Sequence, residues 1–72
     1  MAQEVYAHIT GNVWKIEVQA GAQVSEGDVL VILESMKMEM PIEAPVAGRV
    51  VEIRVKEGQP IAEGAVVVII EE

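Results

Sequence analysis

Short apolar segments alternate with glycine-bearing turns along the whole chain. Apolar residues recur in part at every second position, as in half-buried strands, and no segment has a helical period long enough to predict a helix. Turn spacing of this kind is typical of a small β-sandwich or barrel with about eight strands. The predicted strands cover or centre on residues 13–18, 24, 29–33, 38–42, 50–55, 61 and 66–70, and His8 and Trp14 are also interpreted as strand residues.

The chain repeats itself at a distance of 37 positions. Residues 11–34 and 48–71 are identical at 11 of 24 aligned positions, including three pairs of glycines. This composition would give roughly two or three identities by chance, so the match indicates duplicated supersecondary units. We expect the two copies to pack against each other about a pseudo-twofold axis. Val24 and Ile61 should each place one apolar side chain in the core from a very short strand.

Two glycine-bearing turns recur in each copy of the repeat. They are Ala20-Gly21 and Glu26-Gly27 in the first copy, and Glu57-Gly58 and Glu63-Gly64 in the second. Glycine can supply a positive φ at such positions without steric cost, so we expect matching turns in the two halves.

Composition agrees with a single β domain over residues 1–72. The chain is 51% hydrophobic but contains one Trp, one Tyr and no Phe. Its apolar residues are mainly β-branched, with 13 Val and 8 Ile, and these favour strands over helices. The absence of Cys excludes disulfides, Cys-ligated zinc and thiol catalysis, and a single His provides no second nitrogen ligand for a transition metal. We therefore predict no metal site.

Acidic residues predominate, and the formal net charge is −7. Nucleic acids and anionic membranes reward clustered Lys and Arg, so neither is an expected partner. The longest apolar run, residues 65–70, is too short to cross a bilayer. Residues 1–4 lack the basic and apolar regions of a signal peptide. We expect a soluble, cytoplasmic protein that is monomeric when isolated.

The segment between the repeats, residues 35–47, contains three of the four methionines within five positions. Its pattern predicts a hairpin over residues 34–43 with Met36 and Lys37 at the tip. Two-residue hairpin turns need positive φ, and this tip has no Gly, Asn or Asp, so we expect mild strain there. An exposed lysine is usually only a solvated charge, and clustered methionine more often fills space in a core than recognises a partner.

Glu34 and Glu39 flank this tip and could be interpreted as an acid–base pair. No nucleophile or metal ligand accompanies them in the sequence. No catalytic site is therefore predicted.

A single lysine lies between two methionines, midway between the two repeats. In this arrangement the sequence resembles a known family. The segment Glu34-Ser35-Met36-Lys37-Met38-Glu39 is similar to the biotin attachment motif of biotinyl domains, and the flanking repeats extend the resemblance over essentially the whole chain. The resemblance implies an all-β, flattened β-barrel or sandwich (a barrel-sandwich hybrid) of two four-stranded antiparallel sheets with an internal pseudo-twofold repeat. The short form most resembles free-standing bacterial biotin/lipoyl attachment proteins.

The same resemblance implies a non-catalytic biotin carboxyl carrier. A biotin protein ligase would join biotin to Nζ of Lys37, and the carrier would shuttle a carboxyl group between biotin carboxylase and carboxyltransferase sites. Free lysine has a pKa near 10.4, so the ligase would have to capture the amine in its neutral form. Met36 and Met38 would be apolar recognition contacts, with Glu34, Ser35 and Glu39 as the context of the motif.

Two other functions stay open at this point. A lipoyl domain shares the fold and carries lipoate on a hairpin lysine, but its motif is usually Asp-Lys-Ala. An unmodified β interaction module would need no attachment motif. The methionines on both sides of Lys37 favour biotin over lipoate, and the presence of an attachment motif counts against an unmodified module.

Overall fold

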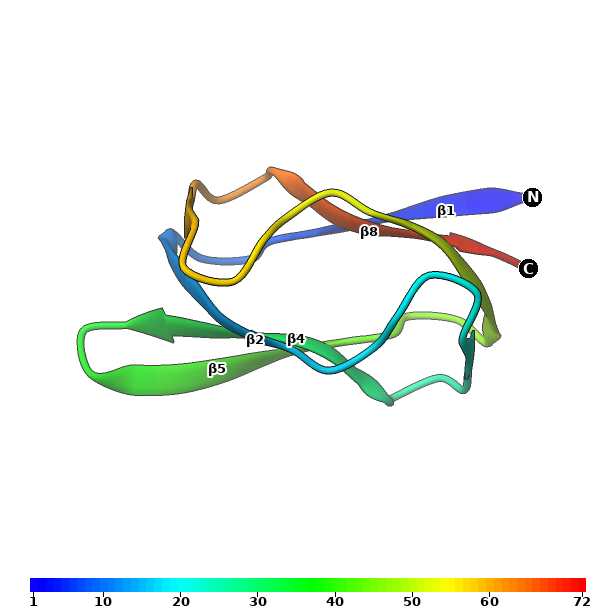
Figure 1. The fold of residues 1–72 in the computed structure, drawn as a ribbon, viewed down its shortest axis with the longest axis horizontal. Coiled ribbons are helices and arrows are strands. Elements are labelled where there is room, and N and C mark those ends of the chain that lie inside the picture. The colour runs from blue at the N-terminus through cyan, green and yellow to red at the C-terminus, as the bar shows by residue number, and fades with distance from the viewer.

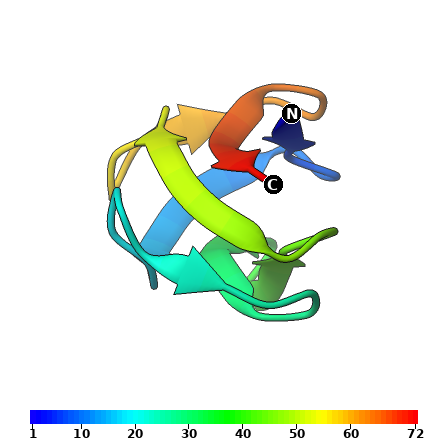
Figure 2. The ribbon, with the colours of Figure 1, turned by 90° about the vertical axis from the view of Figure 1, so that its right-hand side faces the viewer.

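The structure is a computed structural model that describes all residues 1–72. It contains eight strands and no helix. The strands are β1 (Ala2–Tyr6), β2 (Gly11–Ile16), β3 (Gln23–Val24), β4 (Val29–Ser35), β5 (Met38–Glu43), β6 (Gly48–Ile53), β7 (Pro60–Ile61) and β8 (Val66–Glu71). They form two antiparallel four-stranded sheets with the orders β1-β8-β6-β3 and β5-β4-β2-β7. The sheets lie as two layers in Figure 1, and the strands curve around a common centre in the end view of Figure 2. The predicted two-sheet, all-β fold is confirmed.

The internal repeat relates the two sheets. Strands β2, β3 and β4 match β6, β7 and β8 after a shift of 37 residues, to within one residue at each end, and matched strands hold equivalent places in the two sheets. Backbone hydrogen bonds between the halves are reciprocal as well. The N–H of Gly21 donates to the carbonyl of Val50 at 2.6 Å, and that of Gly58 donates to the carbonyl of Val13 at 2.7 Å. The predicted pseudo-twofold packing is therefore confirmed.

The structural repeat extends further than the repeat in the sequence. β1 and β5 occupy equivalent edges of the two sheets, although β5 lies in the segment between the sequence repeats. An edge strand here buries only a few side chains, so only those positions need to match. Val5 and Ile42 are equivalent and both buried, and the same holds for Ala7 and Ala44. The part of the chain with no counterpart is thereby reduced to the hairpin tip.

A thin aliphatic core fills the space between the sheets. Val24 and Ile61 reach it from the two-residue strands β3 and β7, as predicted, and no polar or charged side chain is buried with them. Burial of each such aliphatic side chain contributes about 1.5–3 kcal/mol. The core comprises Val5, Ala7, Val13, Val24, Leu30, Val31, Leu33, Ile42, Ala44, Val50, Val55, Ile61, Val67, Val68 and Ile70.

The four predicted turn glycines all have positive φ, between 87° and 95°, which confirms the turn assignment (Gly21, Gly27, Gly58 and Gly64).

The interpretation of His8 as a strand residue is wrong. β1 ends at Tyr6, and His8 lies in an exposed bend where the chain crosses to the other sheet. Trp14 does lie in a strand, β2, as predicted. No helical segment with the length and apolarity needed to cross a membrane occurs in the structure.

Candidate functional site on the β4–β5 hairpin

The hairpin that joins β4 to β5 ends in a two-residue connection. Ser35 pairs with Met38 across the hairpin, so Met36 and Lys37 form the tip. Their φ angles are 52° and 65°. Positive φ at both central residues is what a type I′ hairpin turn requires, and it matches the right-handed twist of the strands. The expected strain at a tip without glycine is therefore present, because side chains at positive φ cost energy.

The tip projects at the end of the molecule opposite the two termini (Figure 1). Met36 is 92% exposed and Met38 is 61% exposed, and Lys37 between them is also exposed. Clustered methionine more often fills a core, but these two residues do not, since both side chains are largely exposed. Lys37 takes part in neither of the two ion pairs of the structure, which join Met1 to Glu71 and Arg54 to Glu52. Its amine is thus presented to solvent between two apolar thioethers.

The base of the hairpin is held rigidly. β4 is a central strand that pairs with β2 on one side and with β5 on the other. Leu33 is completely buried, and Ile42 is buried on the facing strand. Gly11 at the start of β2 approaches so closely that a Cβ built there would lie 2.5 Å from the carbonyl oxygen of Glu34 and 3.2 Å from Cβ of Ser35. The mobile part of the site is therefore the side chain of Lys37 and not the strands beneath it.

Two carboxylates flank the tip. Glu34 and Glu39 are direct cross-strand partners, and both are exposed. Like charges placed directly opposite each other destabilise a sheet. Neither takes part in an ion pair, and no group of three His, Cys, Asp or Glu side chains in the structure could hold a metal ion. Ser35 between Glu34 and the tip is half-buried.

One pKa shift occurs on the other sheet, at Tyr6. Its phenol donates a hydrogen bond of 2.7 Å to Oε1 of Glu4. This hydrogen bond, together with the negative charge of Glu4 and a small loss of solvation, raises the pKa of Tyr6 above its ordinary value. Tyr6 belongs to β1 and has no part in the hairpin site.

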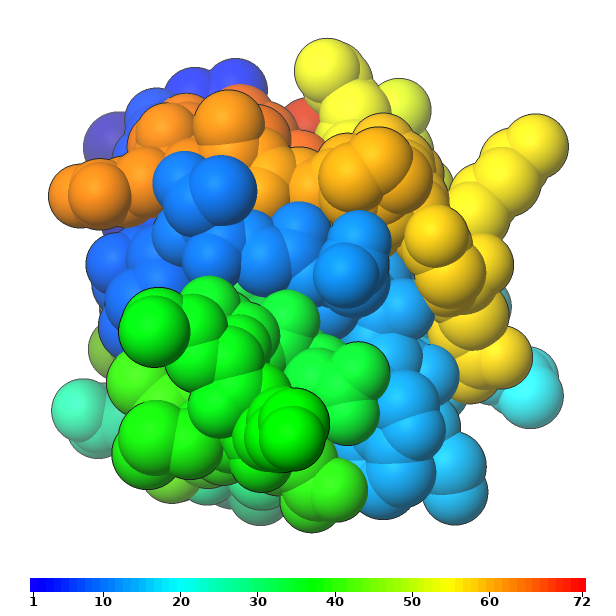
Figure 3. All heavy atoms as spheres, turned by 90° about the vertical axis from the view of Figure 1, so that its left-hand side faces the viewer, coloured from blue at the N-terminus to red at the C-terminus, as the bar shows by residue number.

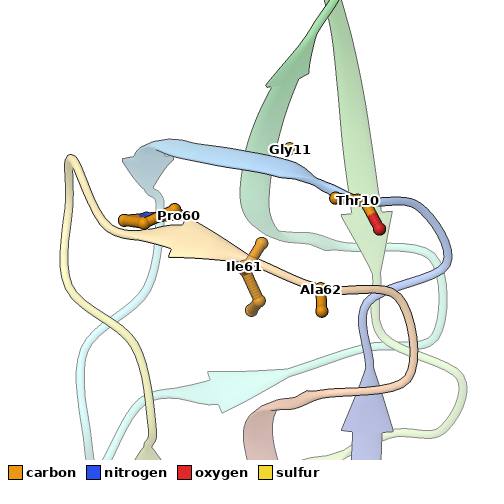
Figure 4. Close-up of a pocket in the computed structure, with 5 residues that line it drawn as sticks. All are labelled: Thr10, Gly11, Pro60, Ile61 and Ala62. Carbon is orange, nitrogen blue, oxygen red and sulfur yellow. The ribbon is translucent and has the colours of Figure 1, made fainter.

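The surface has one hollow, which is shallow, and sequence reasoning did not predict it. It has a volume of about 330 Å³ and is lined by Thr10, Gly11, Pro60, Ile61 and Ala62 (Figure 4). These residues come together because β2 pairs with β7 across the two halves of the chain. Figure 3 shows this end of the molecule, where β2, in blue, lies between the green hairpin and the orange segment that contains β7. A pairing between the halves leaves no local signal in the sequence.

This geometry suits a covalently attached group better than an enclosed ligand. Lys37 is exposed at a hairpin tip with positive φ, an arrangement that would suit an acyl acceptor, and the open hairpin encloses no ligand. An all-β platform that presents such a lysine has the arrangement expected of a carrier domain, a domain that presents an attached group to other proteins. Residues 2–70 match the biotin/lipoyl family, described as "Biotin-requiring enzyme", and the chain belongs to this family.

Curated relatives match about three fifths of the chain. A "Biotinylated protein TB7.3 homolog" from Mycobacterium leprae (strain TN) is 52% identical over 44 residues, which are 61% of this chain and 62% of the relative. A "Biotin/lipoyl attachment protein" from Bacillus subtilis (strain 168) is 52% identical over 40 residues, or 56% of this chain and 55% of the relative. The matched part thus spans less than two thirds of either relative.

Solved structures of two large carboxylases contain the same fold. The crystal structure of Kluyveromyces lactis urea carboxylase superimposes with a TM-score of 0.93 at 35% identity, over 99% of this chain and 6% of that one. A single-chain, multi-domain long-chain acyl-CoA carboxylase gives a TM-score of 0.89 at 32% identity, over 94% of this chain and 7% of that one. In both cases this chain resembles one small part of a much longer protein.

Proposed function

We propose that this chain is a non-catalytic biotin carboxyl carrier whose attachment residue is Lys37. The observation that carries this proposal is the exposed lysine at a positive-φ hairpin tip, flanked by exposed Met36 and Met38. The family match and the names of the relatives, "Biotinylated protein" and "Biotin/lipoyl attachment protein", support biotin as the attached group. Once bound, biotin supplies the chemistry of carboxyl transfer.

Lys37 acts as the nucleophile in the attachment step. Its neutral amine attacks the carboxyl carbon of biotin in an activated acyl form that a biotin protein ligase supplies. An amide bond forms at Nζ, the bond from the carboxyl carbon to its activating group breaks, and the nitrogen releases one proton. The lysine loses its positive charge, and the formal net charge of the chain changes from −7 to −8.

The residues around Lys37 serve recognition and orientation. Met36 and Met38 offer flexible, polarizable side chains that can adapt to the surface of the ligase or of the carboxylase. Glu34, Ser35 and Glu39 complete the motif at the base of the tip. The buried Leu33 and the close approach of Gly11 fix the strands, so motion is confined to the arm beyond Cα of Lys37. Tethering gives the attached group a high effective concentration near each partner site.

The partners we propose are a biotin protein ligase, a biotin carboxylase and a carboxyltransferase. The two superimposed structures are themselves described as carboxylases, which supports the last two partners. We further propose that the isolated domain is a monomer and that it works in the cytoplasm, where it meets these partners as a dissolved, folded domain. Neither nucleic acid nor a membrane surface is among the partners.

Lipoate is the second candidate for the attached group. The family and the name of the Bacillus subtilis relative cover both biotin and lipoyl attachment. The methionines on both sides of Lys37 favour biotin. An unmodified interaction module is disfavoured because such a module needs no attachment motif.

Intact-mass measurement after co-expression with an active biotin protein ligase tests the proposal. We expect one biotinyl adduct on the parent chain and none on Lys37→Arg, since Arg keeps the positive charge but is not an acceptor for this chemistry. Lys56→Arg is the matched control, because Lys56 is an exposed lysine in the second half, and it should take up the adduct like the parent. A lipoyl adduct, or an adduct that persists in Lys37→Arg, would contradict the proposal.

A further inference from the structure

The shallow hollow beside the hairpin is not used by the attachment step. Its lining is mainly apolar, and the hydroxyl of Thr10 is the one polar side-chain group among the five residues (Figure 4). That hydroxyl accepts a hydrogen bond from the backbone N–H of Glu63 at 3.1 Å, and its own O–H donates to no protein group. A hydroxyl has one donor and two acceptor positions, so the donor of Thr10 is available to a ligand.

The hollow lies within reach of a group attached to Lys37. Gly11 lines it, and a Cβ built on Gly11 would stand 3.2 Å from Cβ of Ser35. Lys37 follows Ser35 by two residues, so their Cα atoms are at most about 7 Å apart. A biotinyl-lysine arm contains about ten bonds between Cα and the ring system and extends roughly 12 Å. The arm can therefore fold back from the tip to the hollow without any movement of the strands.

The pseudo-symmetry of the fold provides an internal comparison. The equivalent place at the other end would be lined by Ala47, Gly48, Gln23, Val24 and Ser25, and the structure has no second hollow there. Gln23 and Ser25 stand where the hairpin end has Pro60 and Ala62, and Ala47 lacks the hydroxyl of Thr10. The hollow is thus not a by-product of the fold, because it occurs only at the end that carries the attachment lysine.

We propose that this hollow is a resting site for the bicyclic ring system of biotin on Lys37, an inference that rests on the proposed function. Apolar contact with Gly11, Pro60 and Ala62 suits the thioether-containing ring. The free O–H of Thr10 suits the carbonyl of the ureido ring, which is a hydrogen-bond acceptor. The ring leaves the hollow when the carrier meets a partner.

Nuclear magnetic resonance of the ligase-biotinylated chain tests this directly, after mass analysis has located biotin on Lys37. We expect nuclear Overhauser contacts between ring protons of biotin and the methyl groups of Thr10 and Ala62, which are both exposed. The amide signals of Gly11 and Ala62 should shift between the unmodified and the biotinylated chain. Signal changes confined to residues 35–38, without ring contacts, would overturn the resting site and leave the proposed function standing. Absence of biotin on Lys37 would overturn both proposals.

A rate measurement with matched variants gives a second test. Ala62→Leu fills the hollow, and Ser25→Leu makes the same kind of change at the pseudo-equivalent position. If the ring rests in the hollow for two thirds of the time, the biotinylated Ala62→Leu chain is captured by avidin about threefold faster than the parent, because capture scales with the free fraction. Ser25→Leu should be captured at the parent rate. Equal capture rates for all three chains would overturn the proposal. If Ala62→Leu does not fold, the nuclear Overhauser contacts in the unmutated biotinylated chain decide the proposal.

Discussion

Met36 and Lys37 adopt left-handed backbone conformations in succession, with φ angles of 52° and 65°. Two-residue hairpin turns of this kind usually contain Asn or Gly, which tolerate positive φ. Here a methionine and a lysine occupy both positions, so the chain accepts backbone strain where its candidate attachment residue is presented. Strain of this kind is retained at functional sites when the surrounding structure enforces it.

Replacement of Met36 by Asn should stabilise the domain. Asn is tolerated at positive φ, so Met36→Asn should raise the free energy of unfolding by about 0.5–1 kcal/mol. For a domain of this size, 1 kcal/mol corresponds to roughly 4–8 °C in Tm. Calorimetry of the two chains measures the change. Met36→Leu is the control that keeps both the apolar side chain and the strain, and its Tm should equal that of the parent. A Met36→Asn chain no more stable than Met36→Leu would show that the tip is unstrained.

Gly27 and Gly64 should respond alike to a side chain, because they occupy equivalent turns with φ of 93° and 90°. A Cβ at either position would meet no atom within 4 Å. A lower free energy of unfolding in Gly27→Ala or Gly64→Ala is then due to the backbone conformation alone. We expect each variant to lose about 1–2 kcal/mol. The thermal unfolding of both variants measures it.

Chemical synthesis of the chain permits a mirror-image control for these turns. A D-alanine at position 27 is compatible with positive φ and restricts the unfolded chain, so it should stabilise the domain by about 0.4–1 kcal/mol. If L- and D-alanine had the same effect on Tm, the turn conformation would not be the cause.

Local sequence signals predicted the hairpin tip well. The change from an apolar run to alternating Met38, Met40 and Ile42 marked the end of one strand and the start of the next, and Met36 and Lys37 do lie between them. The turn glycines were equally readable, since positive φ is a local requirement. What a local pattern could not decide was whether Met36 and Met38 fill the core or face solvent, because that depends on how far the opposite sheet extends.

The repeat predicted the packing of the two halves, but two relationships between distant segments were not predictable from the sequence. The equivalence of β1 and β5 depends on a few buried pairs of residues. In the pair Val5 and Ile42 the two residue types differ, so a comparison of identities does not reveal it. The hollow depends on the pairing of Gly11 with Ile61, which lie in different halves of the chain. His8 was misinterpreted for a related reason, since the crossing between sheets that ends β1 has no glycine or proline to mark it.

A comparison of alanine variants at Gly11 and Gly48 should separate an effect on stability from an effect on biotinylation. A Cβ on Gly48 would lie 2.5 Å from the carbonyl oxygen of Glu71 and 2.7 Å from Cγ2 of Ile70, while a Cβ on Gly11 would lie 2.5 Å from the carbonyl oxygen of Glu34. We expect Gly11→Ala and Gly48→Ala each to lose about 1–3 kcal/mol through overpacking. Only Gly11→Ala displaces the base of the hairpin, so only it should slow biotinylation at a temperature where both variants are folded. Equal ligation rates for the two variants would contradict the role assigned to Gly11.

Tyr6 should titrate at a higher pH than a free tyrosine. It is the single tyrosine of the chain, so the absorbance of its phenolate reports one group. The hydrogen bond to Glu4 and the charge of Glu4 raise its pKa, so the midpoint should lie above 10 and fall in Glu4→Ala. Because the pKa is raised in the folded state, the pairing stabilises the fold below the unfolded pKa and is lost as the pH rises through the folded value. Identical midpoints in the two chains would mean that the bond is absent in solution.

The facing carboxylates at the base of the tip give the last prediction. Glu34 and Glu39 are cross-strand partners and both carry negative charge, so Glu39→Lys should exchange repulsion for attraction. We expect a gain of about 0.2–1 kcal/mol in the free energy of unfolding at low salt. The gain should shrink as salt is added, since the pair is exposed and screened.

Glu43→Lys is the matched control for this substitution. It lies on the same strand and changes the net charge equally, but its cross-strand partner is Val29. A Glu43→Lys chain should therefore gain less at low salt than Glu39→Lys, and the difference between the two isolates the pairing from the general relief of an acidic surface. Equal gains would assign the whole effect to net charge. A difference that survives at high salt would assign it to strand propensity and not to the charge pair.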